Sequence, residues 1–318
     1  MDLFFVLSGF LVSRALFRSL VATRSISLRE FYFRRALRTM PAYFVMVACY
    51  FFLPGIREHE ALPPLWKLLT FTQNIALDLR TAGTFSHAWS LCIEEQFYLG
   101  LPVVLLMTRR WRHAPFIVPV LIGAGMAVRA LVYLGQLPPI ASDSFEVQWY
   151  EWIYYPSCSR LDGVIVGTSL AAVYELWPRL RDRVLSYGHR TLVLAIVSWG
   201  LGRCLLCAPL SLAASTCAFP AVAAVYGVLV VAALSPSCFL SRYPSRVTES
   251  IATLSYAVYL SHKACIHVTQ RELGRLGVDP RGNLMFLACL SACLVGAVVL
   301  HVVVERPCLR WRDRVLLR

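Results

Sequence analysis

Long apolar runs alternate with short polar segments along the whole chain of 318 residues. A helix needs about 20 consecutive apolar residues to cross the hydrocarbon core of a bilayer. About nine of the runs approach this length, and they predict membrane-spanning helices at 2–20, 39–56, 86–107, 115–135, 157–176, 191–208, 216–235, 250–268 and 284–304. Proline and glycine mark many of the turns between them. We therefore expect an all-α, polytopic transmembrane helical bundle that forms a single membrane-embedded domain over residues 1–318.

Composition supports the same class, since 58% of the residues are hydrophobic and only 15% are charged. The net charge of +13 could indicate nucleic-acid binding, but most basic residues lie in short loops between the apolar runs. Membrane orientation explains this pattern better than phosphate binding, so no nucleic-acid partner is expected. Arginines concentrate on the side that carries the C-terminal tail. By the positive-inside tendency we expect a cytoplasmic C-terminus and, with nine spans, an outside N-terminus, in an inner or plasma membrane.

Cysteine and histidine give no metal site in this sequence. Most of the eleven cysteines fall within apolar runs, where they are expected to pack as small hydrophobic residues. Cys204 and Cys207 have C-x-x-C spacing, but no second pair of ligands follows them. The histidines are scattered and make no ligand set.

Two adjacent carboxylates, Glu94 and Glu95, lie inside an apolar run. A charged group at the centre of a spanning helix costs roughly 2.5 to 3.5 kcal/mol, so it is expected to be functional or to have a partner. His87, Ser90, Glu94 and Tyr98 share one helical face by their spacing. A purely structural alternative is that Glu94 neutralises Arg160. Glu95 points about 100° away from Glu94, and Arg129 and Arg160 are its expected counter-charges.

Further charged and aromatic groups are candidates for binding or for packing. Arg160 and Asp162 are two residues apart, so each is expected to meet a group on another helix. The arginine cluster Arg34, Arg35 and Arg38 makes a cationic face suited either to a donor's phosphates or to lipid headgroups.

One helical face, formed by Tyr256, Tyr259 and His262, could line a cavity, and a packing role is favoured for the two tyrosines. Lys263 is expected to extend toward the interface, and the sequence 305–307 is expected to end the last helix at Pro307.

Six strings, in order, resemble the acyltransferase-3 family of multi-pass membrane acyltransferases, which attach acyl groups to sugars and glycans. The strings include the opening segment with Ser8 and Gly9, an Arg-x-x-Arg motif at Arg35 and Arg38, and a Ser-x-x-x-Glu motif at Ser90 and Glu94. They cover residues 2–11, 31–43, 68–74 with 87–98, 160–163, 254–262 and 304–307. The resemblance covers nearly the whole chain.

This resemblance implies an O-acyltransferase that moves an acetyl or similar acyl group from a cytoplasmic acyl-CoA, with acetyl-CoA expected, to a hydroxyl of a glycan or lipid-linked sugar. The candidate catalytic residues are Glu94 and Ser90 of the family motif, together with His87, which shares their helical face. The donor would bind at Arg35, Arg38 and Arg34. The expected substrate contacts are Glu95, Trp89, Tyr98, Arg160, Asp162 and His262. No metal is expected.

The chain departs from the family at its start. In the family, a first helix carries an Arg or Lys followed ten residues later by a His regarded as catalytic, and this chain begins after that point. The complete family fold is expected to have ten or more spans, so we expect an N-terminally truncated domain that is inactive if that His is indispensable. A transporter or flippase that uses the buried charges, and a catalytically dead fragment, are the alternatives.

Overall fold

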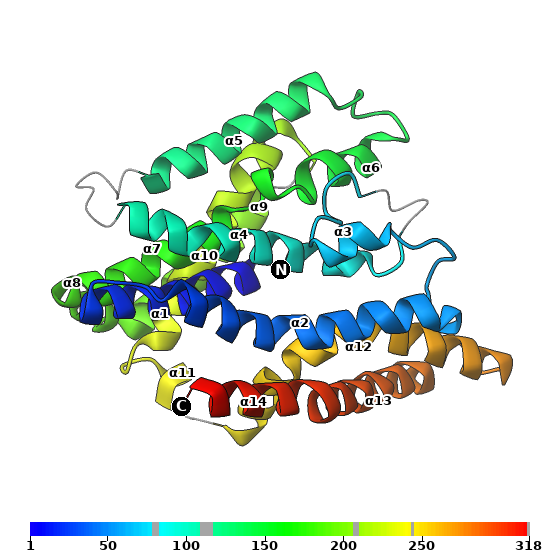
Figure 1. Cartoon of the computed structure of the whole chain (residues 1–318). Coiled ribbons are helices and arrows are strands. Elements are labelled where there is room, and N and C mark those ends of the chain that lie inside the picture. Colours follow the sequence, from blue (N-terminus) through cyan, green and yellow to red (C-terminus); the bar gives the residue numbers. More distant parts are fainter. Residues whose placement is uncertain (78–82, 109–116, 206–209, 243–244, 317–318) are drawn as a thin grey trace. The chain divides into compact units, whose positions relative to one another are not determined.

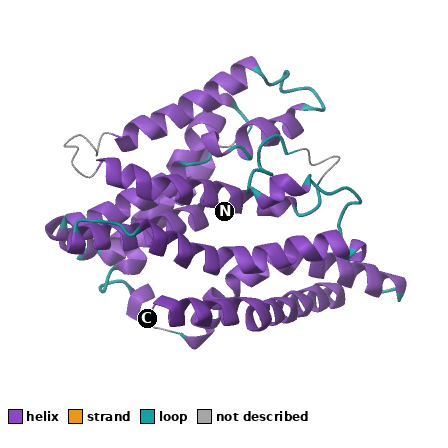
Figure 2. Ribbon diagram, in the orientation of Figure 1, coloured by secondary structure: helices purple, strands orange, loops and turns teal. Residues whose placement is uncertain are grey.

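The computed structural model describes residues 1–77, 83–108, 117–205, 210–242 and 245–316. Within these ranges all regular structure is helical, with no strand, which confirms the predicted all-α fold (Figures 1 and 2). The helices form two compact units, which are described separately. The first unit comprises Met1–Ile26, Asn74–Leu77 and Trp89–Tyr243, and the second comprises Ser27–Gln73, Asp78–Ala88 and Pro244–Arg318. Cys207 of the C-x-x-C sequence lies outside the described residues.

The first unit is built mainly from long apolar helices. They are α1 (Asp2–Thr23), α4 (Trp89–Thr108), α5 (Ile117–Gly135), α7 (Asp162–Leu176), α9 (Gly188–Leu205) and α10 (Leu212–Leu234). Shorter helices connect them, namely α6 (Phe145–Trp149), a π-helix (Tyr150–Tyr154), a 3-10 helix (Ser157–Ser159), α8 (Pro178–Leu185) and α11 (Phe239–Arg242). A cluster including Val6, Phe10 and Ala171 lies at the centre of the apolar core.

Helices α1 and α7 pack more closely than ordinary side chains would permit. A Cβ atom at Gly163 would lie 2.7 Å from the Cβ of Phe5, and one at Gly167 would overlap the Val6 carbonyl oxygen. Gly163 and Gly167 are four residues apart and therefore share a face, which is the small-xxx-small arrangement typical of membrane helix pairs. Gly9 makes the reciprocal approach from α1, because a Cβ there would overlap the Val164 carbonyl oxygen.

The second unit contains α2 (Leu28–Phe52), α3 (Leu65–Leu69), α12 (Arg246–Arg275), α13 (Asn283–Leu300) and α14 (Arg306–Leu316), with 3-10 helices at Pro54–Ile56 and Ser86–Ala88. Ser27 caps α2 by accepting a hydrogen bond from the backbone N–H of Glu30. Buried aromatic rings join α2 to the segments that follow it. Tyr43 stacks on Phe71 with centroids 4.5 Å apart, and Tyr50 meets Phe85 at 4.9 Å.

Five helical segments in the described part of the chain are long and apolar enough to cross a membrane. They are Asp2–Thr23, Ser86–Thr108, Ile117–Gly135, Leu212–Leu234 and Asn283–Leu316. Each of the nine predicted spans overlaps a helix, but nine spans are not confirmed. Helix α7, for example, has only 15 residues, and α2 begins with a charged turn that lowers its mean hydropathy. The chain is a membrane protein by these helices, and the number of crossings stays a prediction.

The last helix does not end at Pro307, so that prediction is wrong. A π-helix over His301–Glu305 connects α13 to α14, and the helical segment runs on to Leu316. Because the hydrogen-bond ladder is already shifted in a π-helix, a proline without an N–H group can follow it without ending the helix. His301 Nδ1 lies 2.7 Å from a carboxylate oxygen of Glu305 across this turn.

We expect Gly167→Leu to lower the free energy of unfolding by about 3 kcal/mol or more, because the new side chain would force α1 away from α7. The measurement is thermal unfolding of the full chain purified in detergent. Gly200→Leu on α9 is the matched control, since a Cβ there meets nothing within 4 Å. Equal stability of the two variants would contradict the close packing of α1 and α7.

Candidate active site

Glu94 is buried in the first unit and is held by two hydroxyl groups. The Ser8 hydroxyl on α1 donates a hydrogen bond of 2.9 Å to one carboxylate oxygen of Glu94, and the Tyr98 hydroxyl donates one of 3.4 Å to the other. Only 2% of the Glu94 surface is exposed. Ser90, one turn earlier, is fully buried. The predicted shared face of Ser90, Glu94 and Tyr98 is therefore turned into the protein, and Ser8 completes it from another helix.

His87 is not part of helix α4. It lies in the 3-10 helix Ser86–Ala88, whereas α4 begins at Trp89. A 3-10 helix has three residues per turn, so the regular α-helical spacing expected from His87 to Glu94 is interrupted at this point. His87 belongs to the second unit and Glu94 to the first, so the grouping of these two side chains stays a prediction.

A closed polar network lies beside the carboxylate segment in the first unit. The Asn74 amide donates to the Tyr155 carbonyl at 3.1 Å and to the Ser157 hydroxyl at 2.9 Å. Ser157 in turn donates to the Gln96 side-chain oxygen at 2.5 Å, and the Gln96 amide donates to the Asn74 oxygen at 3.2 Å. Each of these three polar groups thus has partners, which a buried amide requires. The network holds α4 against the segment that precedes α7.

Arg160 and Asp162 each bind a group on another helix, as predicted. Arg160 makes an ion pair of 2.7 Å with Asp2 on α1. Asp162 pairs with Arg129 on α5 at 2.7 Å, and Arg129 also donates to the Ser159 carbonyl at 2.6 Å. Arg129 is fully buried. The two arginines that were expected to neutralise Glu94 or Glu95 thus pair with aspartates, and their expected contact with the glutamates stays a prediction.

Aromatic rings surround the Arg160 guanidinium. Its central carbon lies 4.2 Å from the ring centre of Phe219, 4.7 Å from that of Tyr154 and 5.8 Å from that of Trp89. A cation is attracted to the faces of such rings, which reduces the cost of burying it. The Nε atom of Arg160 has no hydrogen-bond partner among the described residues. The structure thus brings two predicted substrate contacts, Trp89 and Arg160, into one cluster.

The second unit holds a histidine pair, His87 and His262, with ring centres 4.8 Å apart. The Nδ1 atom of His262 is 2.8 Å from the Tyr259 carbonyl, and the Nε2 atom of His87 is 3.4 Å from the Leu260 carbonyl. Because a carbonyl only accepts hydrogen bonds, each of these nitrogens carries the proton in the neutral ring. The other nitrogen of each ring keeps its lone pair. The arrangement therefore offers two oriented proton acceptors.

Residues around the histidine pair fix its position. The Tyr259 hydroxyl donates to the His87 carbonyl, and the Tyr256 hydroxyl donates to the Thr39 carbonyl at 2.8 Å. These contacts agree with the packing role favoured for the two tyrosines. The Lys263 ammonium donates to the Ser86 hydroxyl at 3.2 Å. Lys263 therefore turns into the unit, contrary to the expectation that it extends toward an interface.

The arginine cluster lies on the first half of α2. Arg34 is engaged by Glu30 through an ion pair of 2.7 Å, one helical turn away. Arg38 is exposed, and Arg35 is partly buried. Arg35 and Arg38 are spaced so that both guanidinium groups leave the same side of the helix. This side could hold an anionic group such as a phosphate.

The described residues contain no group of three or more His, Cys, Asp or Glu side chains that could hold a metal ion.

Comparison with known proteins identifies the family. The model of an acyltransferase domain, the acyltransferase-3 family, matches residues 1–302. The chain belongs to the acyltransferase-3 family. It is 28% identical over 295 residues to a peptidoglycan O-acetyltransferase of Listeria monocytogenes. The aligned region covers 84% of this chain and 44% of that protein. It is 30% identical over 195 residues to an uncharacterized protein of Haemophilus influenzae, covering 55% of this chain and 75% of that protein.

This acyltransferase-3 chain thus spans less than half the length of its Listeria relative. No solved structure matches it. The family match includes both motifs named from the sequence, the arginines on α2 and the Ser-x-x-x-Glu segment on α4.

Several residues of this acyltransferase-3 chain were missed by the sequence analysis. Ser8 and Asp2, which bind Glu94 and Arg160, could not be assigned because nothing local shows which helix lies beside α4 or α7. Asn74 was quoted only as part of a motif. Gly163 and Gly167 have the G-x-x-x-G spacing that indicates a helix-packing face, so a signal for the α1–α7 contact was present in the sequence.

We expect Arg129→Met to lower the free energy of unfolding by about 3 to 5 kcal/mol, because it leaves Asp162 buried without its ion-pair partner. The double variant Arg129→Met with Asp162→Leu should recover part of this loss, since no unpaired charge then remains. Chemical unfolding of the purified full chain measures both effects. Arg181→Ala, which removes an exposed ion pair with Asp182, is the control and should change nothing measurable. A single variant as stable as the double one would contradict the pairing.

Proposed function

We propose that this protein is a membrane-bound O-acyltransferase that moves an acetyl or similar small acyl group from a cytoplasmic acyl-CoA to a hydroxyl of a glycan or lipid-linked sugar. The family match over residues 1–302 carries this proposal. The peptidoglycan O-acetyltransferase of Listeria, which this chain resembles over most of its own length, supports a glycan as acceptor.

The donor would bind through the exposed side of α2. Coenzyme A carries several phosphates, and guanidinium groups hold phosphate through paired N–H donors. Arg38 and Arg35 supply two such groups one turn apart. Arg34 contributes less in this proposal because Glu30 already engages it. The concentration of arginines in the loops on the C-terminal side favours a cytoplasmic location for this face.

The acyl transfer would depend on buried polar groups of α4. The reaction needs a group that takes the acceptor's hydroxyl proton, donors that stabilise the oxyanion, and protection from water. Two hydroxyl groups hold the Glu94 carboxylate in place. In our proposal Glu94 orients the acceptor or the proton-accepting imidazole, with Ser90 on the same face. His87 is a candidate for that imidazole, since its Nδ1 keeps a lone pair. Trp89, Arg160, Asp162 and His262 would contribute to acceptor binding.

We expect Glu94→Gln in the full-length protein to reduce acyl transfer by at least about 100-fold, the usual scale for a lost acid or base function. The substitution keeps the shape of the side chain, so the melting temperature should stay near that of the unmodified protein. The assay follows acceptor-dependent release of free CoA from acetyl-CoA by protein in vesicles. Tyr98→Phe is a milder control that removes one hydrogen bond to the carboxylate. Full transfer by the Glu94 variant would refute the proposed role.

We expect Arg38→Ala to raise the apparent KM for acetyl-CoA by about tenfold, because a charge-assisted phosphate contact contributes about 1.5 to 3 kcal/mol. The acceptor KM should stay unchanged. Arg29→Ala, at the start of the same helix and equally exposed, is the matched control. An unchanged donor KM in the Arg38 variant would show that this face does not bind coenzyme A.

The alternative function is a transporter or flippase. Movement of an intact substrate across the vesicle membrane without release of CoA would support that alternative.

A further inference from the structure

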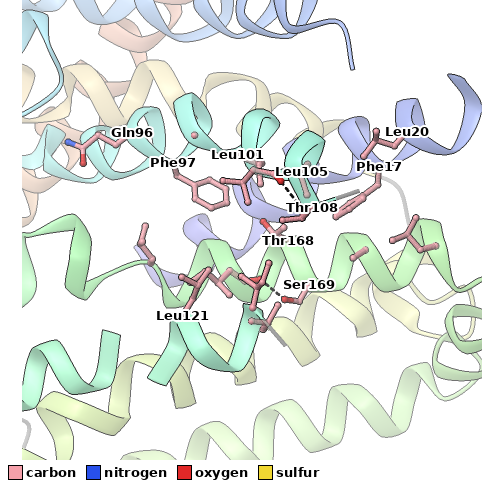
Figure 3. A pocket seen from close by; sticks show the side chains of 18 of the residues that line it. Phe17, Leu20, Gln96, Phe97, Leu101, Leu105, Thr108, Leu121, Thr168 and Ser169 are labelled. Carbon is pink, nitrogen blue, oxygen red and sulfur yellow. Dashed lines mark hydrogen bonds between the residues drawn. The ribbon is translucent and has the colours of Figure 1, made fainter. Parts of the chain in front are cut away.

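The first unit contains a half-open apolar cavity of about 1100 Å³, lined mainly by helices α1, α4, α5 and α7. Figure 3 shows Phe17 and Leu20 from α1, together with Phe97, Leu101 and Leu105 from α4, around this space. The volume lies slightly above the range of small-molecule pockets, which is about 300 to 1000 Å³. An apolar cavity disfavours water. The natural content of such a space is therefore hydrocarbon.

The cavity has the length of one bilayer leaflet. Its lining on α4 extends from Gln96 to Thr108, which corresponds to about 18 Å along the helix axis at 1.5 Å per residue. One leaflet contributes about half of a hydrocarbon core that is about 30 Å thick. A single acyl chain of an ordinary membrane lipid would therefore fit along the cavity. A chain much longer than a leaflet would extend beyond it.

The two ends of the cavity differ in chemistry. Arg24, which follows the last turn of α1, and Trp177, which follows α7, line one end. Tryptophan and arginine are typical of the level of lipid headgroups in a membrane. The other end is lined by Gln96 and Ser157. The Ser157 hydroxyl donates a hydrogen bond to the Gln96 side-chain oxygen, so these two polar groups already bind one another at this end of the cavity.

The charge at the Arg24 end of the cavity fits an anionic headgroup. Arg24 supplies a guanidinium group at this end of the lining. Elsewhere along α1, Arg14 and Arg18 both pair with Glu175 of α7, at 2.7 Å and 3.5 Å, so the described arginines of α1 and its C-cap outnumber this carboxylate. Basic pockets between membrane helices bind the phosphates of anionic lipids.

We propose that this cavity is a lipid-binding site that holds one acyl chain of an anionic phospholipid, with the lipid phosphate at Arg24. The site is separate from the proposed transfer chemistry and does not depend on it. The Glu94 carboxylate is turned toward Ser8 on α1 rather than into this cavity. Its proposed role is to bind a resident lipid between four helices of the first unit.

Gly100 provides a direct test, because it lines the cavity and a Cβ there meets nothing within 4 Å. Gly100→Phe should fill the space without distorting the helices. Gly123→Phe is the matched control, since Gly123 also has open space around it but does not line the cavity. The probe is native mass spectrometry of the full chain released from nanodiscs that contain equal amounts of phosphatidylglycerol and phosphatidylcholine.

We expect the unmodified protein and the Gly123 variant to retain one phosphatidylglycerol molecule, and the Gly100 variant to retain about tenfold less. Arg24→Gln should keep lipid in the cavity but reduce the preference for phosphatidylglycerol about fivefold, the scale of one basic group near an anionic headgroup. The melting temperatures of the three variants verify that each is folded. Equal lipid retention by the two glycine variants would overturn the proposal. Preferential retention of an added polyisoprenyl phosphate would overturn the assignment to a phospholipid.

Discussion

The close approach of α1 and α7 is the constraint on which the first unit depends. Three glycines remove the Cβ atoms that would hold these helices apart, so backbone meets backbone along the contact. Within a bilayer there is little hydrophobic driving force between helices, because lipid tails are as apolar as the side chains, and close packing becomes the main source of attraction. The Ser13 and Thr168 hydroxyl groups, 2.8 Å apart, add a hydrogen bond to the same contact. The position of α1 then determines which groups face α4.

The buried charges of the first unit follow from this packing. Asp2 reaches Arg160 because α1 and α7 begin near one another, and Ser8 reaches Glu94 because α4 lies on another side of α1. Arg129 joins Asp162 from α5. A charge buried in a helical bundle is tolerated only with a partner or with several hydrogen bonds. The two ionic contacts therefore join α5 to α7 and α1 to the residues just before α7.

The histidine pair of the second unit is held by a different kind of contact from the buried charges of the first unit. Its histidine pair, His87 and His262, is oriented by backbone carbonyl groups near the middle of α12. A carbonyl determines which ring nitrogen carries the proton and adds no charge. Both rings therefore keep a defined lone pair, and His87 is the more buried of the two.

The sequence by itself determined the class of the molecule. The lengths of its apolar runs require helices, because within a membrane only helices satisfy every backbone group locally, and all nine runs overlap helices. Residues two apart on a helix do not face each other, so the sequence also predicted that Arg160 and Asp162 bind groups on other helices. It further predicted that Glu94 needs a partner, because it lies inside an apolar run. It placed the last helix end wrongly at Pro307, where a π-helix lets the backbone continue.

Only the tertiary structure decided which partners those groups have. Ser8 bound to Glu94, Asp2 to Arg160 and Asn74 to Gln96 are contacts between residues 22 to 158 positions apart. Helical periodicity gives the direction in which a side chain points but not the helix that lies there. That choice depends on the close packing at Gly9, Gly163 and Gly167, which is a property of two surfaces together. For the same reason the cavity between α1, α4, α5 and α7 could be found only once the helices were placed.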